Sequence, residues 1–161
     1  MWDSVQLDLQ KLLPLLLPRA IAWAEATAAD VAASGNPLDD TGVSIARAVG
    51  VQRPSLIRVL MVDRLPLPSD PELQAAALQT GLLGPTMAGL TLGYSILICH
   101  GQISLPLLSH ECRHVYQFEQ AGSIAAFLPL YLGSIVEVGY SNSPFEQDAR
   151  EYEITKNKLG Q

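Results

Sequence analysis

The chain has 161 residues, of which 48% are hydrophobic and only 16% are charged. This length suits one compact domain, 1–161, with a core of its own, and the apolar composition excludes an intrinsically disordered chain. The formal net charge of -6 offers no basic surface for a phosphate backbone, so we expect no nucleic-acid partner.

The N-terminal part of the chain is predicted to be helical. Residues 4–34 are rich in Leu, Ala and Glu at helical spacing. Pro14 and Pro18 should split them into a short first piece and a long Ala-rich helix, because proline removes a helix hydrogen bond. A turn then leads into a further helix over 41–49, which Gly50 stops.

A strand, a helix and a hairpin are predicted next. Residues 55–68 are rich in Leu, Ile and Val with partial alternation, and they end in prolines as a strand leaving a sheet does. The segment 69–84 has capping residues, a proline suited to the first helical turn and two closing glycines, which predicts a helix. Two β-rich runs around Gly93, within 86–103, indicate a hairpin.

The last third returns to helical patterns. A helix is predicted over about 106–120, ended by Gly122, and Ser143 can cap another. The apolar segment 127–136 is interpreted as core rather than as a dimer face. The whole pattern predicts an α+β fold with N-terminal helices (1–53), a small mixed or antiparallel sheet of about three to four strands (54–104) and C-terminal helices (105–161).

The stretch LSHECRHVYQFE, residues 108–119, carries the motif HExxH on a helix. His110 and His114 lie within about 40° of each other around the helix axis, so both imidazoles can reach one ion. Two imidazoles and a third ligand hold zinc and leave one position for water, whose pKa falls to about 7. Glu111 is the expected general base, whereas Cys112, about 200° from His110, is interpreted as a packing or surface thiol.

Several residues could supply the third ligand. The metzincin pattern is excluded, because Gln117 and Gln120 stand where it requires Gly and His. His100 is interpreted as a turn residue, and Glu119 faces the wrong side of the helix. The remaining candidates are Glu137, Glu146, Asp148, Glu151 and Glu153. Glu146 could instead satisfy a backbone N–H in a capping box.

Parts of the chain resemble a known family. LSHECRHVYQFEQAGSIAAFLPLYL followed by GYSNSPFEQDARE is similar to the minimal gluzincin-type metallopeptidase domains, the minigluzincins, and to uncharacterised bacterial proteins with HExxH and a later NPxE-A-like phrase. AGLTLGYSILI resembles the sheet segment before the active-site helix. The resemblance covers roughly residues 55–155 and implies a zincin-like fold in which Glu146 is the third zinc ligand, with Glu137 the alternative. Arg150 stands where many gluzincins have an Asp that supports a zinc-bound His, and Asp148 or Glu151 would have to replace it.

The resemblance implies a zinc-dependent metallopeptidase. Zn²⁺ would be held by His110, His114 and Glu146, with Glu111 as the general base. An extended peptide or protein substrate would bind along the strand near residues 90–98.

Further residues and two other functions stay open. Tyr140, and behind it Tyr152, are candidates for stabilising the oxyanion, and Gln117 is a candidate for orienting a ligand. The domain could instead be a non-hydrolytic module with structural zinc or a protein-binding role. It could also be a latent peptidase whose polar C-terminal segment, 154–161, covers the site. The oligomeric state is not predicted.

A reducing, cytoplasmic setting is expected. Cys99 and Cys112 are too few for a disulfide framework. The N-terminal stretch is not read as a signal peptide, because Asp3 and Asp8 precede its only Lys and prolines interrupt its apolar run. The uncharged stretch 123–136 is too short to span a bilayer as a helix, so no membrane partner is expected.

Overall fold

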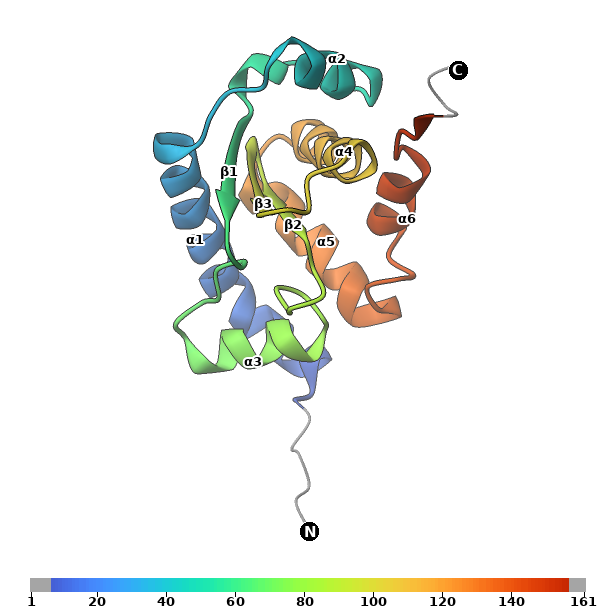
Figure 1. The fold of residues 1–161 in the computed structure, drawn as a ribbon. Coiled ribbons are helices and arrows are strands. Elements are labelled where there is room, and N and C mark those ends of the chain that lie inside the picture. The colour runs from blue at the N-terminus through green and yellow to red at the C-terminus, as the bar shows by residue number, and fades with distance from the viewer. Residues whose placement is uncertain (1–6, 157–161) are drawn as a thin grey trace.

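The structure is a computed structural model that describes residues 7–156. These residues form six α-helices, one 3₁₀ turn and three strands, in the order α1 (Leu9–Ser34), α2 (Asp40–Ala48), η1 (Pro54–Leu56), β1 (Arg58–Val62), α3 (Pro71–Gln79), β2 (Gly89–Leu92), β3 (Ser95–Cys99), α4 (Leu105–Ala121), α5 (Ile124–Val138) and α6 (Pro144–Glu151). The predicted mixture of helix and strand, an α+β fold, is confirmed (Figure 1).

The helices begin where capping side chains occur in the sequence. Asp39, Asp70, Ser104 and Ser143 each accept a hydrogen bond from a backbone N–H of the following first turn. Gly122, with φ 102°, ends α4 in the left-handed conformation. The helices predicted over 41–49, 69–84 and 106–120 are therefore present, with ends shifted by a few residues.

The N-terminal helix differs from the prediction. α1 runs unbroken from Leu9 to Ser34 and contains both Pro14 and Pro18, so the predicted split is wrong. The helix continues because its apolar face is packed after each proline. Leu16, two residues after Pro14, is 3% exposed, and Ala20, two residues after Pro18, is 7% exposed. This tertiary packing outweighs the helix hydrogen bonds that the prolines remove. Residues 4–6 of the predicted helix lie outside the described residues.

The sheet has the strand order β1-β3-β2, with β3 in the centre. β3 pairs parallel with β1 and antiparallel with β2, and Gly93 at φ 66° supplies the turn of the predicted β2–β3 hairpin. Ile96 and Ile98 pack in one core cluster with α2 and α4, whereas Leu97 packs with Val31 of α1. Helices therefore cover both faces of the sheet.

The last helices pack around α4. α5 contacts α1 and α4, and α6 contacts α4, so α4 lies between the sheet and α6 (Figure 1). Within the segment 127–136, Phe127, Leu128 and Ile135 are buried, whereas Leu130 is 57% exposed. This segment therefore contributes three residues to the core while most of its others are half-buried, and α4 is held from several sides.

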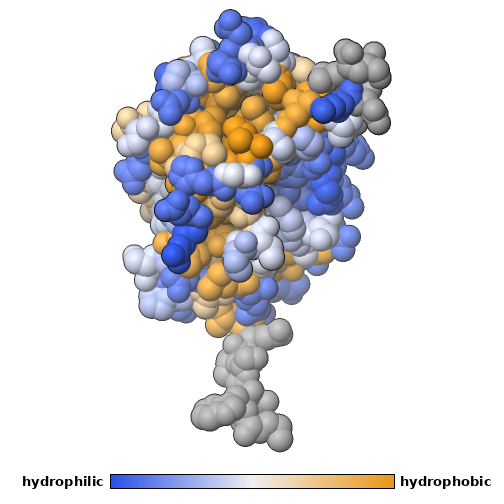
Figure 2. Space-filling view, in the orientation of Figure 1, coloured by the Kyte–Doolittle hydropathy of each residue, from blue (hydrophilic) through white to orange (hydrophobic). Residues whose placement is uncertain are grey.

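The surface has apolar side chains beneath α2, where Ile103 is exposed beside Leu105 and Leu108 (Figure 2). Across residues 7–156, no helix by itself has the length and apolar character needed to cross a membrane. α4 and α5 meet that criterion only as a pair, and the two are bent by 117° relative to each other.

Candidate metal centre

Three side chains from α4 and α6 meet beside the sheet. His110 Nε2 lies 3.1 Å from Glu146 Oε1, and His114 Nε2 lies 3.1 Å from Glu146 Oε2. One ligand atom from each residue lies within 4.8 Å of the other two, so the group could hold a metal ion. The structure thus brings together the three residues that the sequence nominated as ligands, and we name them the His-His-Glu cluster.

The Glu146 carboxylate faces the two histidines rather than the first turn of its own helix. Ser143 Oγ accepts from the N–H of Phe145, and the N–H of Ser143 donates to Tyr140 O. Glu146 is only 1% exposed and accepts a hydrogen bond from the Tyr131 hydroxyl at 2.6 Å. The capping-box interpretation of Glu146 therefore does not hold.

Burial and charge oppose each other in the cluster. Burial favours the neutral form of Glu146, but its hydrogen bonds to His110 and His114 lower the pKa of this carboxyl well below its usual range. Burial likewise favours a neutral His110, yet Glu146, Glu111 and Glu153 raise the pKa of His110 to about 9. The carboxylate is therefore ionised at neutral pH and available as an anionic ligand.

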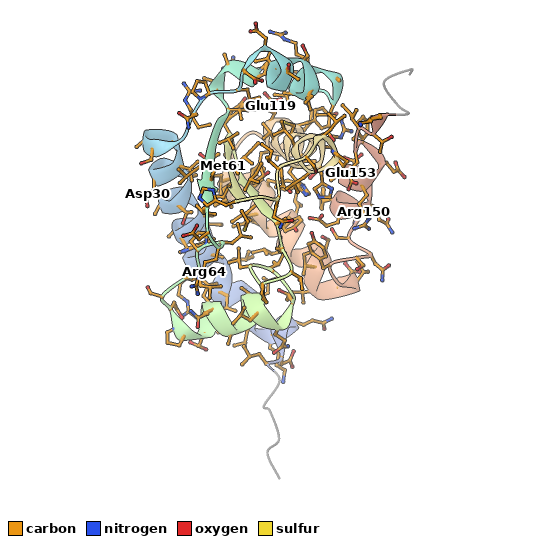
Figure 3. The ribbon with its side chains drawn as sticks, viewed as in Figure 1. Asp30, Met61, Arg64, Glu119, Arg150 and Glu153 are labelled. Atoms are coloured by element: carbon orange, nitrogen blue, oxygen red, sulfur yellow. The ribbon has the colours of Figure 1, made fainter. Side chains whose placement is uncertain are left out.

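Each imidazole has a partner on its other nitrogen. His110 Nδ1 lies 2.8 Å from Glu153 Oε2, and His114 Nδ1 lies 2.8 Å from Gln117 Oε1. Figure 3 shows Glu153 between α4 and the end of α6. Because a pKa of about 9 keeps His110 protonated at neutral pH, a metal ion would have to displace its Nε2 proton. A proton that stays on each Nδ1 would then direct the Nε2 lone pair at the ion, which is how side chains around metal sites orient histidine ligands.

These partners correct the sequence analysis in detail. Glu153, considered only as a ligand, instead contacts the outer nitrogen of His110. Gln117 does contact His114 as expected, and its amide donates to Asp148 Oδ2 and to Phe145 O, both at 2.9 Å. Asp148 therefore reaches the cluster through Gln117 and not by touching a histidine.

Arg113, an inner residue of the motif, ties α6 to α4. Its Nε donates to Asp148 at 2.8 Å, and its Nη1 donates to Val49 O at 2.7 Å. The guanidinium lies 3.8 Å from the ring centroid of Tyr116 and 3.5 Å from that of Tyr152. Tyr152 therefore packs on Arg113, which makes it a poor candidate for the oxyanion role.

Glu111 is buried against β2. Its Oε1 accepts from the Thr91 hydroxyl at 2.8 Å. Gly89 lies so close that a Cβ at this position would be 3.2 Å from the Glu111 carboxylate. Strand β2 therefore fixes the side chain of Glu111, which lines the same cavity as His114 and Glu146.

An apolar cavity of about 140 Å³ lies beside the cluster. Glu111, His114, Glu146 and Tyr140 are part of its wall, and most of the other lining side chains are apolar ones from α1, α3, β2, α4 and α5. Such a concave site, with a few polar groups at one place on an apolar wall, is typical of small-molecule and substrate sites.

Two tyrosines line this cavity, Tyr140 and Tyr131. Burial, together with the charges of Glu146 and Glu111, raises the pKa of both phenols well above its ordinary value, so both remain hydrogen-bond donors at neutral pH. Tyr131 was missed in the sequence. Its position four residues after Phe127 and four before Ile135, on the buried face of α5, was the available signal.

The other candidates lie away from the cluster. His100 is exposed and lies 3.6 Å from Asp63, and Glu137 is exposed on α5. Glu119 accepts hydrogen bonds from the backbone N–H groups of Gln52 and Arg53 on the far side of α4. Cys112 is fully buried in the core, which settles its packing role.

No protein-family model, curated protein or solved structure matches this chain. The described residues form a His-His-Glu cluster that could bind a metal ion, with Glu111 and an apolar cavity beside it.

Proposed function

We propose that the chain is a zinc-dependent metallopeptidase of the gluzincin type, with a zincin-like fold. The convergence of His110, His114 and Glu146, with a partner on each imidazole, carries the proposal. Two histidine nitrogens and one carboxylate are a ligand set of hydrolytic zinc sites. The β2–β3 hairpin beside the HExxH helix and the third ligand on a later helix support the zincin-like assignment.

Zinc bound by this cluster would supply a water of pKa about 7 and polarise the substrate carbonyl. Among the described residues that line the cavity, only Glu111 and Glu146 carry carboxylates, which leaves Glu111 as the base. Glu111 accepts a proton from the water as the water oxygen bonds to the carbonyl carbon. The C–N bond then breaks and Glu111 returns the proton to the nitrogen, which yields a carboxylic acid and an amine.

Tyr140 is the proposed donor to the developing oxyanion, because it lines the cavity and keeps its proton at neutral pH.

The substrate is a peptide or protein. Within the segment 90–98, only β2 lies at a sheet edge, since β3 is paired on both sides. A peptide could therefore pair only with β2. The cytoplasmic setting remains part of the proposal and rests on the two free cysteines.

Metal analysis tests the ligand assignment. The full chain should bind zinc, whereas His114→Ala and Glu146→Gln should lose most of it, because each removes one of three ligands. Glu137→Gln is the matched control, since it changes an exposed carboxylate of α5 outside the cluster. Zinc content unchanged by Glu146→Gln would contradict the assignment.

Hydrolysis is tested separately from metal binding. Glu111→Gln should retain zinc and lower the cleavage of a mixed peptide library by about 10²–10⁴-fold, as removal of a general base does. Cleavage products are read by mass spectrometry. If zinc-loaded wild type and Glu111→Gln are equally inert, the non-hydrolytic alternative is favoured instead.

A further inference from the structure

The cavity beside the His-His-Glu cluster is elongated. On α1 it is lined by Leu9, Leu13, Leu16, Ala20, Trp23 and Ala24. These positions recur every three or four residues and so follow one face of the helix. At 1.5 Å per residue they extend over about 22 Å of the helix axis. Lining side chains that follow one helix face over such a length indicate an elongated channel rather than a round pocket.

The channel is apolar over most of its wall. α3 contributes Leu73, Ala76 and Ala77, and α5 contributes Leu128, Leu132 and Ile135. Thr80, from the end of α3, presents no free hydroxyl proton, because its Oγ1 donates to Ala77 O at 2.8 Å. The carboxylate and imidazole groups of the wall come from α4 and α6 only, at the cluster end.

Small side chains keep the space open between helices. Ala20 and Ala24 lie on the lining face of α1, and Ala76 and Ala77 lie on α3. Ala20 and Ala76 are buried in the same core cluster. A larger side chain at either position would therefore enter the channel rather than solvent.

We propose that this channel binds an unbranched apolar chain, with its carbonyl group at the His-His-Glu end. The polypeptide backbone of an unmodified peptide would lose its hydrogen bonds to water against these walls, whereas an alkyl chain loses none. The substrate class that follows is an acyl amide or N-acylated peptide. The assignment of this substrate class rests on the proposed hydrolytic function. Binding of an apolar ligand in the channel does not depend on that function.

The reaction for this class balances without a further reactant. Water adds to the acyl carbonyl carbon, the bond from that carbon to nitrogen breaks, and the nitrogen leaves with the proton passed on by Glu111. The products are a long-chain carboxylic acid and a free amine or peptide N-terminus.

Chain-length dependence tests the channel in the wild-type protein. Hexanamide, octanamide and decanamide would be titrated into the full chain, with and without zinc, by calorimetry. Affinity should rise about fourfold per added methylene, which corresponds to about 0.8 kcal/mol. Equal affinity across the series would overturn the proposal.

Filling the channel gives a second test. Ala20→Leu and Ala76→Leu should weaken decanamide binding by tenfold or more, because the added side chain occupies the channel. Ala22→Leu is the matched control, since Ala22 is exposed on another face of α1. This variant should bind decanamide with the affinity of the wild type. Equal affinities for Ala20→Leu and Ala22→Leu would contradict the proposal. The wild-type series needs no variant and stands if Ala20→Leu fails to fold.

The two proposals fail in different ways. If the chain is no zinc hydrolase, amides still bind the zinc-free protein with the same length dependence. If the channel proposal is wrong, zinc-dependent cleavage of unacylated peptides remains and no length dependence is seen. The release of decanoate from decanamide is then compared with its release from an N-decanoyl peptide. The faster reaction shows whether the preferred substrate is a simple acyl amide or an N-acylated peptide.

Discussion

At the scale of single residues, an inner position of HECRH supports the candidate ligands. Arg113 binds Asp148, which in turn accepts from Gln117, the partner of His114. A bidentate guanidinium contact of this kind cannot be reproduced by lysine. The orientation of His114, a candidate ligand, is therefore supported by Asp148 of α6, which lies outside the His-His-Glu cluster.

Gly89 has a specific role toward Glu111. Gly89→Ala should lower any hydrolytic activity by at least tenfold while zinc content stays unchanged, because the new methyl group would lie 3.2 Å from the Glu111 carboxylate and displace it. Activity and zinc content are measured on the same preparation.

Gly133→Ala is the control for Gly89→Ala. A Cβ at Gly133 meets no atom within 4 Å, and the residue lies inside α5. Alanine there should leave activity unchanged and raise the free energy of unfolding by about 0.5–1 kcal/mol. If Gly89→Ala hydrolyses substrate at the wild-type rate, the position in which β2 holds the Glu111 carboxylate is not required for activity.

At the scale of elements, local signals predicted most of the fold. Caps, closing glycines and the β-rich runs within 86–103 located α2, α3, α4, α6 and the β2–β3 hairpin, because these signals act within a few residues. Pro14 and Pro18 led to the wrong prediction of a split in α1. The burial of Leu16, which stabilises the unbroken helix, comes from contacts with residues distant in the sequence. The partner role of Glu153 was equally hidden, because Glu153 lies 43 positions after His110 and reaches it only once α6 has docked.

Glu119 connects three elements on the side of α4 away from the cluster. It accepts from the N–H groups of Gln52 and Arg53, just before η1, and from the Tyr94 hydroxyl in the β2–β3 turn at 2.8 Å. Burial and the charge of Glu119 raise the pKa of Tyr94 to about 12. This phenol therefore holds its proton more strongly in the folded chain than at its ordinary pKa of about 10.

The Tyr94 contact should make stability depend on alkaline pH. Because the folded pKa lies above the unfolded one, its contribution is complete below about pH 10 and is lost as pH rises toward 12. The midpoint of urea unfolding should fall more steeply over this interval for wild type than for Tyr94→Phe. If the urea midpoints of wild type and Tyr94→Phe fall equally steeply, Tyr94 contributes nothing to the dependence of stability on alkaline pH.

At the scale of the whole molecule, metal binding and folding should be linked. The ligands come from α4 and α6, so an ion that binds the folded chain stabilises their docking. At a free zinc concentration of 100 times Kd, the gain is about 2.7 kcal/mol. For a chain of this size we expect Tm to rise by roughly 5–10 °C in thermal unfolding.

The controls for that shift are a chelator and His114→Ala. The chelator should return Tm to its starting value, and the variant should show no zinc-dependent shift because it lacks one ligand. An equal shift in wild type and His114→Ala would place the stabilising ion elsewhere on the chain.

The separation of 36 positions between His110 and Glu146 also sets an order of events during synthesis. Chains emerge from the N-terminus, so α4 exists before the helix that carries the carboxylate. A nascent chain offers two imidazoles and no complete site. Any metal ion that the cluster binds would therefore be acquired only after α6 has docked against α4.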